Sequence, residues 1–285
     1  MEMQVAIEEL VEKGVFISQI ESWDFLSGGT SSQVAKVCCE GDWEYVVKIN
    51  DSCVIRAEAR FLCIYGGLSI LPSPVYEADE YVVYPFLEGE TSGIRPEKRQ
   101  MLQELVVGLI NHYRMATRGS GWYSDVHWLR FLQKETMGAR LIIGHNLSEE
   151  DALLIVRIVQ KQPIEPAMLL HGDCGVHNFL FQDQHLSAVI DPIPVDGPPT
   201  YDLIFAFFSS PEDLTEKTLT YALQFLKTPI PGDFYGSVLI GLYIRIARCL
   251  LHHPADLEQY LEAWEYWKLC YYRQKNSTLL DSSVE

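Results

Sequence analysis

The spacing of hydrophobic and polar residues changes once along the chain, from strand-like alternation to helical periodicity. Residues 4–13 have the spacing of a short amphipathic helix, and after them apolar residues alternate with polar ones between turn residues. In the strand expected over residues 43–49, Trp43 and Tyr45 fall on one face and Lys48 on the other, because successive side chains of a strand point to opposite faces. The beginning of the chain is therefore predicted to form a sheet.

Further strands and one helix complete this first part. They are a strand, turn and strand over residues 26–37, a helix over 56–65 that Gly66 ends, and strands over 75–78 and 81–87. From Gly89 onward the periodicity is mostly helical. This change places the predicted boundary between two domains, residues 1–88 and residues 89–285, just before Gly89.

Helix signals recur through the second part. Pro96 opens one helix, and Ser148 with Asp151 offers a capping box for another. Four more helices are centred near residues 205, 221, 244 and 264. Between them, apolar residues at 179–181 and 186–190 bracket a turn and predict a short hairpin. An antiparallel sheet followed by a mainly helical segment predicts an α+β fold class.

Composition places the chain among ordinary globular proteins and narrows its partners. Of its 285 residues, 48% are hydrophobic and 21% are charged, which excludes long disordered segments. The net charge of −17 argues against a nucleic-acid partner, because a phosphate backbone requires a basic surface. A cationic small-molecule substrate would suit this charge, although the acidic residues are spread along the chain and solubility explains them equally simply.

Cysteine usage and apolar segments bear on the compartment. The seven cysteines show no Cys-x-x-Cys pair and no zinc-ligand spacing, so free thiols in a reducing compartment are expected. The N-terminus lacks the basic and apolar regions of a signal peptide. The most apolar stretch, residues 238–251, is interrupted by Arg245 and Arg248 and is shorter than the roughly 20 residues that span a bilayer. We expect a cytoplasmic protein without a membrane partner, with this stretch as a buried helix.

One segment contains the residue types that phosphoryl transfer requires. Asp173 and Asn178 lie five positions apart, and Asp191 follows the predicted hairpin. Because the hairpin leads the chain out and back, Asp191 should arrive beside Asn178. Phosphoryl transfer needs a carboxylate that accepts the hydroxyl proton and oxygen ligands that hold Mg²⁺ on the phosphates. These three side chains supply both parts.

The same motifs resemble a known family. His-Gly-Asp at residues 171–173, Asn178, and Ile-Asp at residues 190–191 are similar to the motifs of the aminoglycoside phosphotransferase and choline kinase-like branch of the protein-kinase fold. The resemblance implies a two-lobed protein-kinase-like fold, with an antiparallel-sheet N-terminal lobe and a mainly helical C-terminal lobe. It implies Asp173 as the catalytic base, with Asn178 and Asp191 as Mg²⁺ ligands.

Residues upstream agree with a kinase, which needs a lysine on its third strand held by a glutamate of the next helix. Lys48 and Glu58 occupy those places. Residues 27–32 would cover the phosphates through backbone N–H groups, and residues 84–87 would form the hinge for the base. The predicted nucleotide contacts are Ser27, Gly28, Gly29, Thr30, Ser31, Ser32, Lys48, Glu58, Tyr84, Phe86 and Leu87. Pro85 in the hinge leaves open whether ATP or GTP is used together with Mg²⁺.

Supporting and substrate residues are less strongly marked. His171 is interpreted as a structural residue of the catalytic loop, and the resemblance implies that Asp202 braces that loop. Asp196 lies near the catalytic segment and is a candidate substrate contact. Glu262 and Glu265 are further candidates, although their helical spacing also fits a solvated helix face.

Three functions remain open at this point. The first is a kinase that transfers the γ-phosphate to a hydroxyl of an aminoglycoside-type antibiotic. The second keeps this chemistry but uses a metabolite such as choline, ethanolamine, homoserine or a methylthiosugar. The third is a nucleotide-binding pseudokinase, against which the presence of Lys48, Asp173, Asn178 and Asp191 argues.

Overall fold

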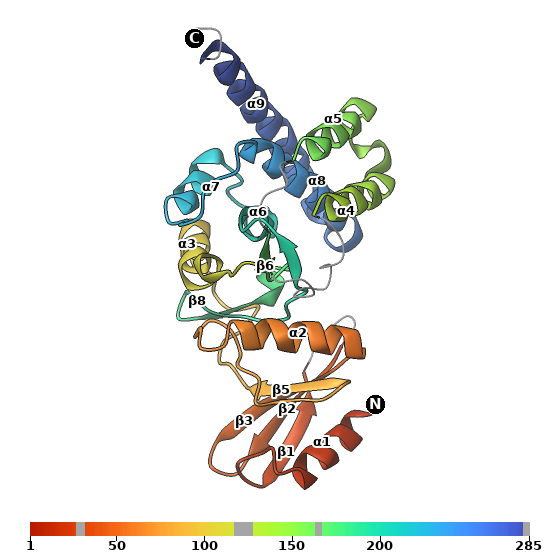
Figure 1. The fold of residues 1–285 in the computed structure, drawn as a ribbon, viewed down its shortest axis with the longest axis vertical. Coiled ribbons are helices and arrows are strands. Elements are labelled where there is room, and N and C mark those ends of the chain that lie inside the picture. The colour runs from red at the N-terminus through yellow and green to blue at the C-terminus, as the bar shows by residue number, and fades with distance from the viewer. Residues whose placement is uncertain (27–31, 117–127, 163–166, 282–285) are drawn as a thin grey trace.

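The computed structural model describes residues 1–26, 32–116, 128–162 and 167–281, with side chains as far as residue 276. Its first part is a five-stranded antiparallel sheet in the order β1-β2-β3-β5-β4. The strands are β1 (Ile20–Phe25), β2 (Gln33–Cys39), β3 (Trp43–Ile49), β4 (Tyr76–Glu77) and β5 (Tyr81–Pro85). Helix α1 (Met3–Glu12) covers one face of the sheet and α2 (Ser52–Ile64) covers the other, on the side of the helical part (Figure 1).

The alternation along β3 explains how the sheet divides its side chains. Tyr45, Val47 and Ile49 are buried together with residues of α1, whereas Val46 belongs to the larger core that contains α2. Lys48 lies on the Val46 face, since residues two apart in a strand share a face. The prediction that Lys48 lies opposite the aromatic row is therefore confirmed.

Helix α2 begins four residues earlier than its apolar spacing predicted. The sequence favoured a start at residue 56, but the carbonyl of Asp51 already accepts hydrogen bonds from the N–H groups of Val54 and Ile55, at 2.9 and 3.1 Å. The first turn, residues 52–55, contains three consecutive apolar residues, and such a run does not show helical periodicity.

The rest of the chain is mainly helical, as predicted. Its helices are α3 (Lys98–Gly108), α4 (Trp128–Ile143), α5 (Glu149–Gln160), α6 (Thr200–Phe208), α7 (Glu216–Leu223), α8 (Phe234–His252) and α9 (Leu257–Asp281). Ser148 caps α5 through the expected capping box with Asp151. The boundary between residues 88 and 89 stays a prediction.

Two short strand pairs hold the middle of the helical part together. The hairpin of β7 (Phe179–Gln182) and β8 (His185–Val189) confirms the predicted one. A second pair, β6 (Met168–Leu170) with β9 (Val195–Gly197), was not predicted, because three residues are too few to show a period of two. This pair joins the chain just before the Asp173 loop to the chain just after Asp191.

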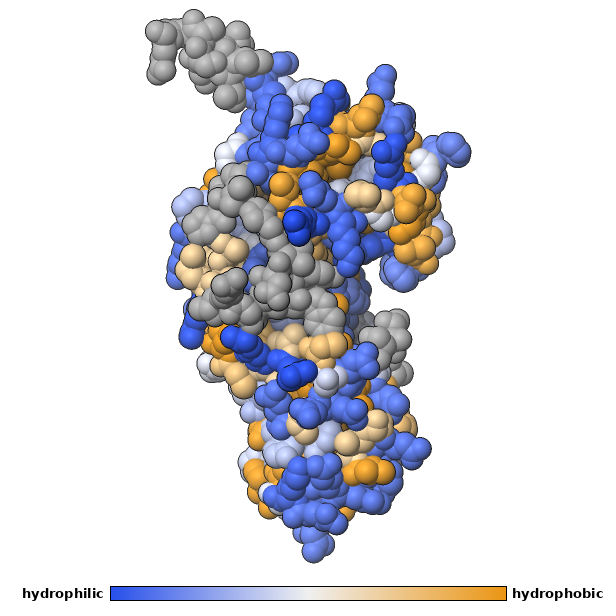
Figure 2. All heavy atoms as spheres, turned by 45° about the vertical axis from the view of Figure 1, so that its right-hand side comes forward, coloured by the Kyte–Doolittle hydropathy of each residue, from blue (hydrophilic) through white to orange (hydrophobic). Residues whose placement is uncertain are grey.

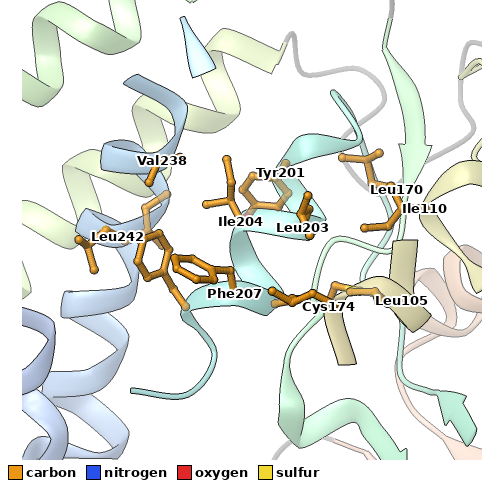
Figure 3. Packing of buried hydrophobic residues seen from close by; sticks show 14 of the residues in the cluster. Leu105, Ile110, Leu170, Cys174, Tyr201, Leu203, Ile204, Phe207, Val238 and Leu242 are labelled. Atoms are coloured by element: carbon orange, nitrogen blue, oxygen red, sulfur yellow. The ribbon is translucent and has the colours of Figure 1, made fainter. Parts of the chain in front are cut away.

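Helix α6 lies at the centre of the helical core. Figure 3 shows Ile204 and Phe207 on the side of α8, together with Val238 and Leu242. All four side chains are almost completely buried, and each such burial stabilises the fold by about 1.5–3 kcal/mol. The core thus fixes α6 in place and, with it, the residues at its N-terminal end.

Helix α8 is long and apolar enough to cross a membrane by length and composition, the one such helix in the described part of the chain. More than half of it is buried inside the protein, where it contacts α4, α5, α6 and α9. We interpret it as a core helix, as the sequence predicted.

Exposed hydrophobic residues are found on the projection formed by α4 and α5, where Met137, Leu141 and Leu153 are exposed (Figure 2).

Candidate active site

A cavity of about 310 Å³ lies where the sheet meets the helical part. The sheet contributes Val34 and Val46 to its lining, and the hairpin region contributes Leu180 and Ile190 from the opposite side. The chain after β5 also lines it. Three of the four residues of the predicted hinge, Tyr84, Phe86 and Leu87, are among the lining residues.

Lys48 is the central cation beside this cavity. Its Nζ donates to Glu58 Oε2 of α2 at 2.6 Å and also to the carboxylate of Asp191. The side chains of Lys48 and Glu58 are 3% and 1% exposed, so the pair is almost fully removed from water. The structure therefore brings together one residue from β3, one from α2 and one from the chain that follows β8.

Burial and charge act against each other in this group. Burial alone would lower the pKa of Lys48, but the carboxylates of Glu58 and Asp191 outweigh it and raise that pKa above its usual value. Burial raises the pKa of Glu58 to about 7, although the Lys48 ammonium opposes the change. Lys48 is therefore a permanent cation at neutral pH.

Asp173 lies in the loop after β6, and each of its carboxylate oxygens faces different groups. Oδ2 accepts hydrogen bonds from Asn178 Nδ2 at 3.0 Å and from His177 Nε2 at 3.1 Å. Oδ1 lies 3.4 Å from an Arg248 nitrogen of α8. Burial raises the pKa of Asp173, but the hydrogen bond from His177 and the charge of Arg248 outweigh it and leave the pKa lowered. The carboxylate is ionised at neutral pH.

Asn178 links Asp173 to Asp191. Its side-chain amide donates to Asp173, while its backbone carbonyl accepts the N–H of Ile190 at 2.9 Å. Asp191 follows directly, with a positive φ of 60° and a side chain that is 48% exposed. The hairpin therefore returns Asp191 to the neighbourhood of Asn178, as its spacing predicted. A non-glycine residue with positive φ is uncommon, and such backbone strain concentrates at functional sites.

His171 holds the loop through both ring nitrogens. Nε2 donates to the Ile190 carbonyl at 3.0 Å, and Nδ1 accepts the N–H of Asp173 at 3.3 Å. The ring is completely buried, and this burial lowers its pKa to about 4. His171 is therefore neutral and ties the Asp173 loop to the residue before Asp191.

Gly172 is required by its surroundings. Its φ is +82°, and a Cβ at this position would lie 2.0 Å from the carbonyl oxygen of Ile193. Only glycine fits between His171 and Asp173 in this geometry.

Asp202 at the start of α6 supports the same loop. Its carboxylate accepts the N–H groups of His171 and Gly172, at 2.9 and 3.1 Å, and the hydroxyl of Tyr113 at 2.6 Å. Burial raises the pKa of Asp202 to about 7, although these three donors oppose the change. The position of the loop thus depends on α6, which the core holds in place.

The other predicted residues are placed as follows. Residues 27–31 lie outside the described residues, and the hydroxyl of Ser32 accepts a hydrogen bond from Asn50 at 2.7 Å. Asp196 lies in β9, paired in register with Leu169. Glu262 and Glu265 are exposed on α9, and Glu265 pairs with Lys268 at 2.8 Å. In the described part of the chain, no hydrogen bond or ion pair joins either glutamate to Asp173.

Arg248 was not predicted as a site residue. It lies 75 positions beyond Asp173, and the sequence shows it only as an interruption of an apolar helix. That interruption was the available signal, because a charged residue within a buried helix must face either a partner or a cleft.

Comparisons with known proteins agree with this arrangement. A model of the phosphotransferase enzyme family (APH) matches residues 22–232. No curated protein matches the sequence. Solved structures share the fold at low identity. The streptomycin-ATP ternary complex of APH(2'')-IIa is 17% identical, with a TM-score of 0.61, over 93% of this chain and 98% of its own.

Two further structures extend the comparison. The macrolide 2'-phosphotransferase MphH from Brachybacterium faecium is 13% identical, with a TM-score of 0.61, over 92% of this chain and 97% of its own. The GDP complex of aminoglycoside 2'-phosphotransferase-IIIa is 16% identical, with a TM-score of 0.61, over 94% of this chain and 99% of its own. The family model covers most of the chain and the fold is that of these kinase-like enzymes. The chain therefore belongs to the phosphotransferase enzyme family and is a small-molecule kinase.

Proposed function

We propose that the protein transfers the γ-phosphate of ATP or GTP to a hydroxyl of a small molecule, with Asp173 as the catalytic base. One observation carries the proposal. Asn178 contacts Asp173 through its side chain and Ile190 through its backbone, so the ionised base lies next to the turn where Asp191 meets Lys48. A base for the acceptor and a cation for the phosphates are thus held in one site.

The reaction follows from these positions. Asp173 orients the acceptor hydroxyl and takes its proton as the hydroxyl oxygen attacks the γ-phosphorus. The new oxygen–phosphorus bond forms while the bond from the γ-phosphorus to the β-phosphate oxygen breaks, and the nucleoside diphosphate leaves. Lys48, fixed by Glu58, would bind the α- and β-phosphates and so set the distance between nucleotide and acceptor.

The donor set near Asp191 fits Mg²⁺. The Asp191 carboxylate is half exposed, and the Asn178 amide uses its nitrogen on Asp173, which leaves its oxygen for a metal. The described residues contain no cluster of three His, Cys, Asp or Glu side chains suited to a metal. Mg²⁺ does not need one, since it commonly binds to one or two protein oxygens together with substrate phosphates. When bound, it would offset the negative charge of those phosphates.

The hinge has a polarity that suits a purine base. The N–H of Phe86 donates to the Glu44 carbonyl of β3 at 2.9 Å. Because peptide groups of neighbouring residues in a strand point to opposite edges, the carbonyl of Pro85, the last residue of β5, faces away from β3, and an extended chain beyond it would turn the Leu87 N–H the same way. We assign these two groups to the base. Pro85 lies where only an acceptor is needed, so its missing N–H costs nothing at this position. Relatives of this fold are complexed with ATP or with GDP, and both nucleotides are retained in the proposal.

The acceptor is proposed from two sources. The sequence motivates an aminoglycoside-type antibiotic, and the relatives named above act on aminoglycosides or macrolides. A metabolite is the second candidate. The Arg248 contact with Asp173 favours homoserine or a methylthiosugar over choline and ethanolamine, because a guanidinium beside the base repels an acceptor with a net positive charge.

The test is phosphoryl transfer from Mg·ATP and Mg·GTP across aminoglycosides, macrolides and hydroxylated metabolites. The Asp173→Ala variant should lower kcat by about 10²–10⁴ while the nucleotide Kd changes little, because the base contacts the acceptor and not the nucleotide. Asp79→Ala, at an exposed turn of the sheet, is the matched control and should behave as wild type. Nucleotide binding without transfer to any acceptor would indicate a pseudokinase instead.

A further inference from the structure

Tyr65, directly after the last residue of α2, has a buried hydroxyl that joins two segments of the helical part. The hydroxyl donates to the Leu169 carbonyl of β6 at 2.6 Å and accepts the N–H of Arg114 at 3.0 Å. Burial raises the pKa of Tyr65 to about 12, so at neutral pH the hydroxyl keeps the proton that it donates. A side chain from the sheet side of the molecule thus meets the strand that leads into the Asp173 loop.

This hydroxyl lies where a backbone hydrogen bond would otherwise form. An antiparallel bridge joins Met115 to Met168, and next to it the N–H of Leu169 donates to the Arg114 carbonyl at 3.0 Å. In a regular antiparallel ladder the N–H of Arg114 would donate back to the Leu169 carbonyl. Both of these groups bond to the Tyr65 hydroxyl instead. The side chain is therefore inserted into the ladder between β6 and the segment around residue 114.

The same face of α2 carries two further contacts of the site. Glu58, Phe61 and Tyr65 follow one another at spacings of three and four, which places them on one face of a helix. Phe61 packs edge-on against His171, and the rings of Tyr65 and Tyr113 also lie 5.7 Å apart. The helix that holds the buried lysine through Glu58 therefore also contacts the catalytic loop and its support.

The inserted hydroxyl is close to the base along the chain. Leu169 lies four residues before Asp173, and β6 ends at Leu170, directly before the loop. A shift of β6 would reach Asp173 through three intervening residues. A misplacement of about 1 Å can lower the rate of an enzyme by about 10².

We propose that Tyr65 is a positioning residue for phosphoryl transfer, whose inserted hydroxyl sets the spacing between α2 and β6. The distance between Lys48, held from α2, and Asp173, carried after β6, depends on this spacing. Without the hydroxyl the buried Leu169 carbonyl lacks a donor, and the N–H of Arg114 moves toward it to close the ladder. The loop moves with Leu169. This inference rests on the proposed phosphotransferase function.

Tyr65→Phe tests the proposal, because it removes the hydroxyl and keeps the ring. Transfer is measured from Mg·ATP and Mg·GTP to whichever aminoglycoside, macrolide or hydroxylated metabolite the wild type phosphorylates fastest. The kcat should fall at least about tenfold, while the nucleotide Kd should stay within about twofold because Tyr65 does not line the nucleotide cavity. Turnover is divided by the folded fraction from urea unfolding. A wild-type kcat per folded molecule overturns the proposal.

Tyr260→Phe is the matched control. The Tyr260 hydroxyl is also buried, donates to the Phe208 carbonyl at 2.8 Å and accepts from Arg245 Nε at 3.0 Å, but it joins α9 to the far end of α6 and to α8. This variant should also lose stability, because it removes the same kinds of hydrogen bond, and should keep the wild-type kcat. Equal falls in kcat for both variants would indicate a general loosening of the protein and overturn the assignment to Tyr65.

Amide hydrogen exchange of the wild type gives a reading that does not depend on how the variant folds. If Tyr65 holds the N–H of Arg114, exchange there should be at least about 10² slower than in an unfolded chain. Exchange at the unfolded rate would overturn the proposal. Wild-type turnover separates the two levels: nucleotide binding without transfer removes the kinase function, whereas undiminished transfer by Tyr65→Phe removes only this inference.

Discussion

His171 shows how one buried side chain connects stability to the geometry of the site. Its two ring nitrogens bond to Ile190 and Asp173, so only the tautomer with hydrogen on Nε2 satisfies both partners. Phe61 packs edge-on against the ring, with centroids 5.7 Å apart. A protonated ring would add a donor on Nδ1, where the N–H of Asp173 already points. The loop is therefore built around the neutral form.

This neutral form predicts an acid-sensitive fold. The pKa of His171 is about 4 in the folded protein against 6.5 for an exposed histidine. As pH falls from 6.5 to 4, the unfolded chain binds a proton that the folded chain does not, so the free energy of unfolding should drop by about 3 kcal/mol. Above pH 6.5 the contribution is constant. The measurement is urea unfolding at several pH values, comparing wild type with His171→Gln.

The variant should be less stable at every pH but should lack this part of the pH dependence. His145→Gln, which changes an exposed histidine after α4, is the control and should keep the wild-type curve. Parallel curves for wild type and His171→Gln would mean that His171 does not titrate as proposed.

At the scale of elements, the catalytic loop is shaped by what surrounds it. Asp202 accepts hydrogen bonds from two of its N–H groups, and the β6–β9 pair holds the chain just before the loop. Gly172 passes so close to the Ile193 carbonyl that a Cβ would lie 2.0 Å from it. The loop is therefore fixed by backbone contacts from three directions.

Gly67 and Gly172 have similar backbone conformations but different surroundings. Substituting each by alanine therefore separates the cost of backbone strain from the cost of a steric clash. Gly67 has a φ of +94° with nothing within 4 Å of an added Cβ, whereas Gly172 has a φ of +82° and the collision. Gly67→Ala should therefore cost only the conformational strain, about 1–2 kcal/mol, with normal kcat. Gly172→Ala should cost more than this and also lower kcat by at least about tenfold, since a shift of the loop misplaces Asp173.

The measurements are urea unfolding and steady-state turnover on the same preparations. Equal losses of stability in the two variants would show that the loop moves freely to accept the Cβ, and the argument for a tightly held Asp173 would fail.

The same elements show what the sequence could and could not predict. The sheet, the β7–β8 hairpin and the capping box at Ser148 follow from local pattern and turn chemistry, which act over a few residues. Lys48, Asp173, Asn178 and Asp191 could be predicted as site residues because each proposed role needs one residue type at one spacing. The partner of Arg248 and the β6–β9 pair depend on contacts between distant parts of the chain, which the local pattern does not show.

Lys48 forms ion pairs with residues from both parts of the molecule. Its partners Glu58 and Asp191 come from α2 on the sheet side and from the turn after β8 on the helical side. Asp191 is half exposed and can exchange this partner for a metal or water, whereas Glu58 cannot, because it is 1% exposed. Glu58 Oε1 has no hydrogen-bond partner among the described residues, so Lys48 alone compensates its charge.

A double-mutant cycle therefore measures the coupling between Lys48 of β3 and Glu58 of α2. Lys48→Met leaves Glu58 buried without a cation and should destabilise the protein by about 3 kcal/mol. Lys48→Met combined with Glu58→Gln removes both charges, so it should recover part of that loss, and the coupling energy should exceed about 1 kcal/mol. Losses that simply add would show that the two side chains do not compensate each other. Mg·ADP at 100 times its wild-type Kd should stabilise the wild type by about 2.7 kcal/mol, and under the proposed role of Lys48 in phosphate binding neither variant should gain this full stabilisation.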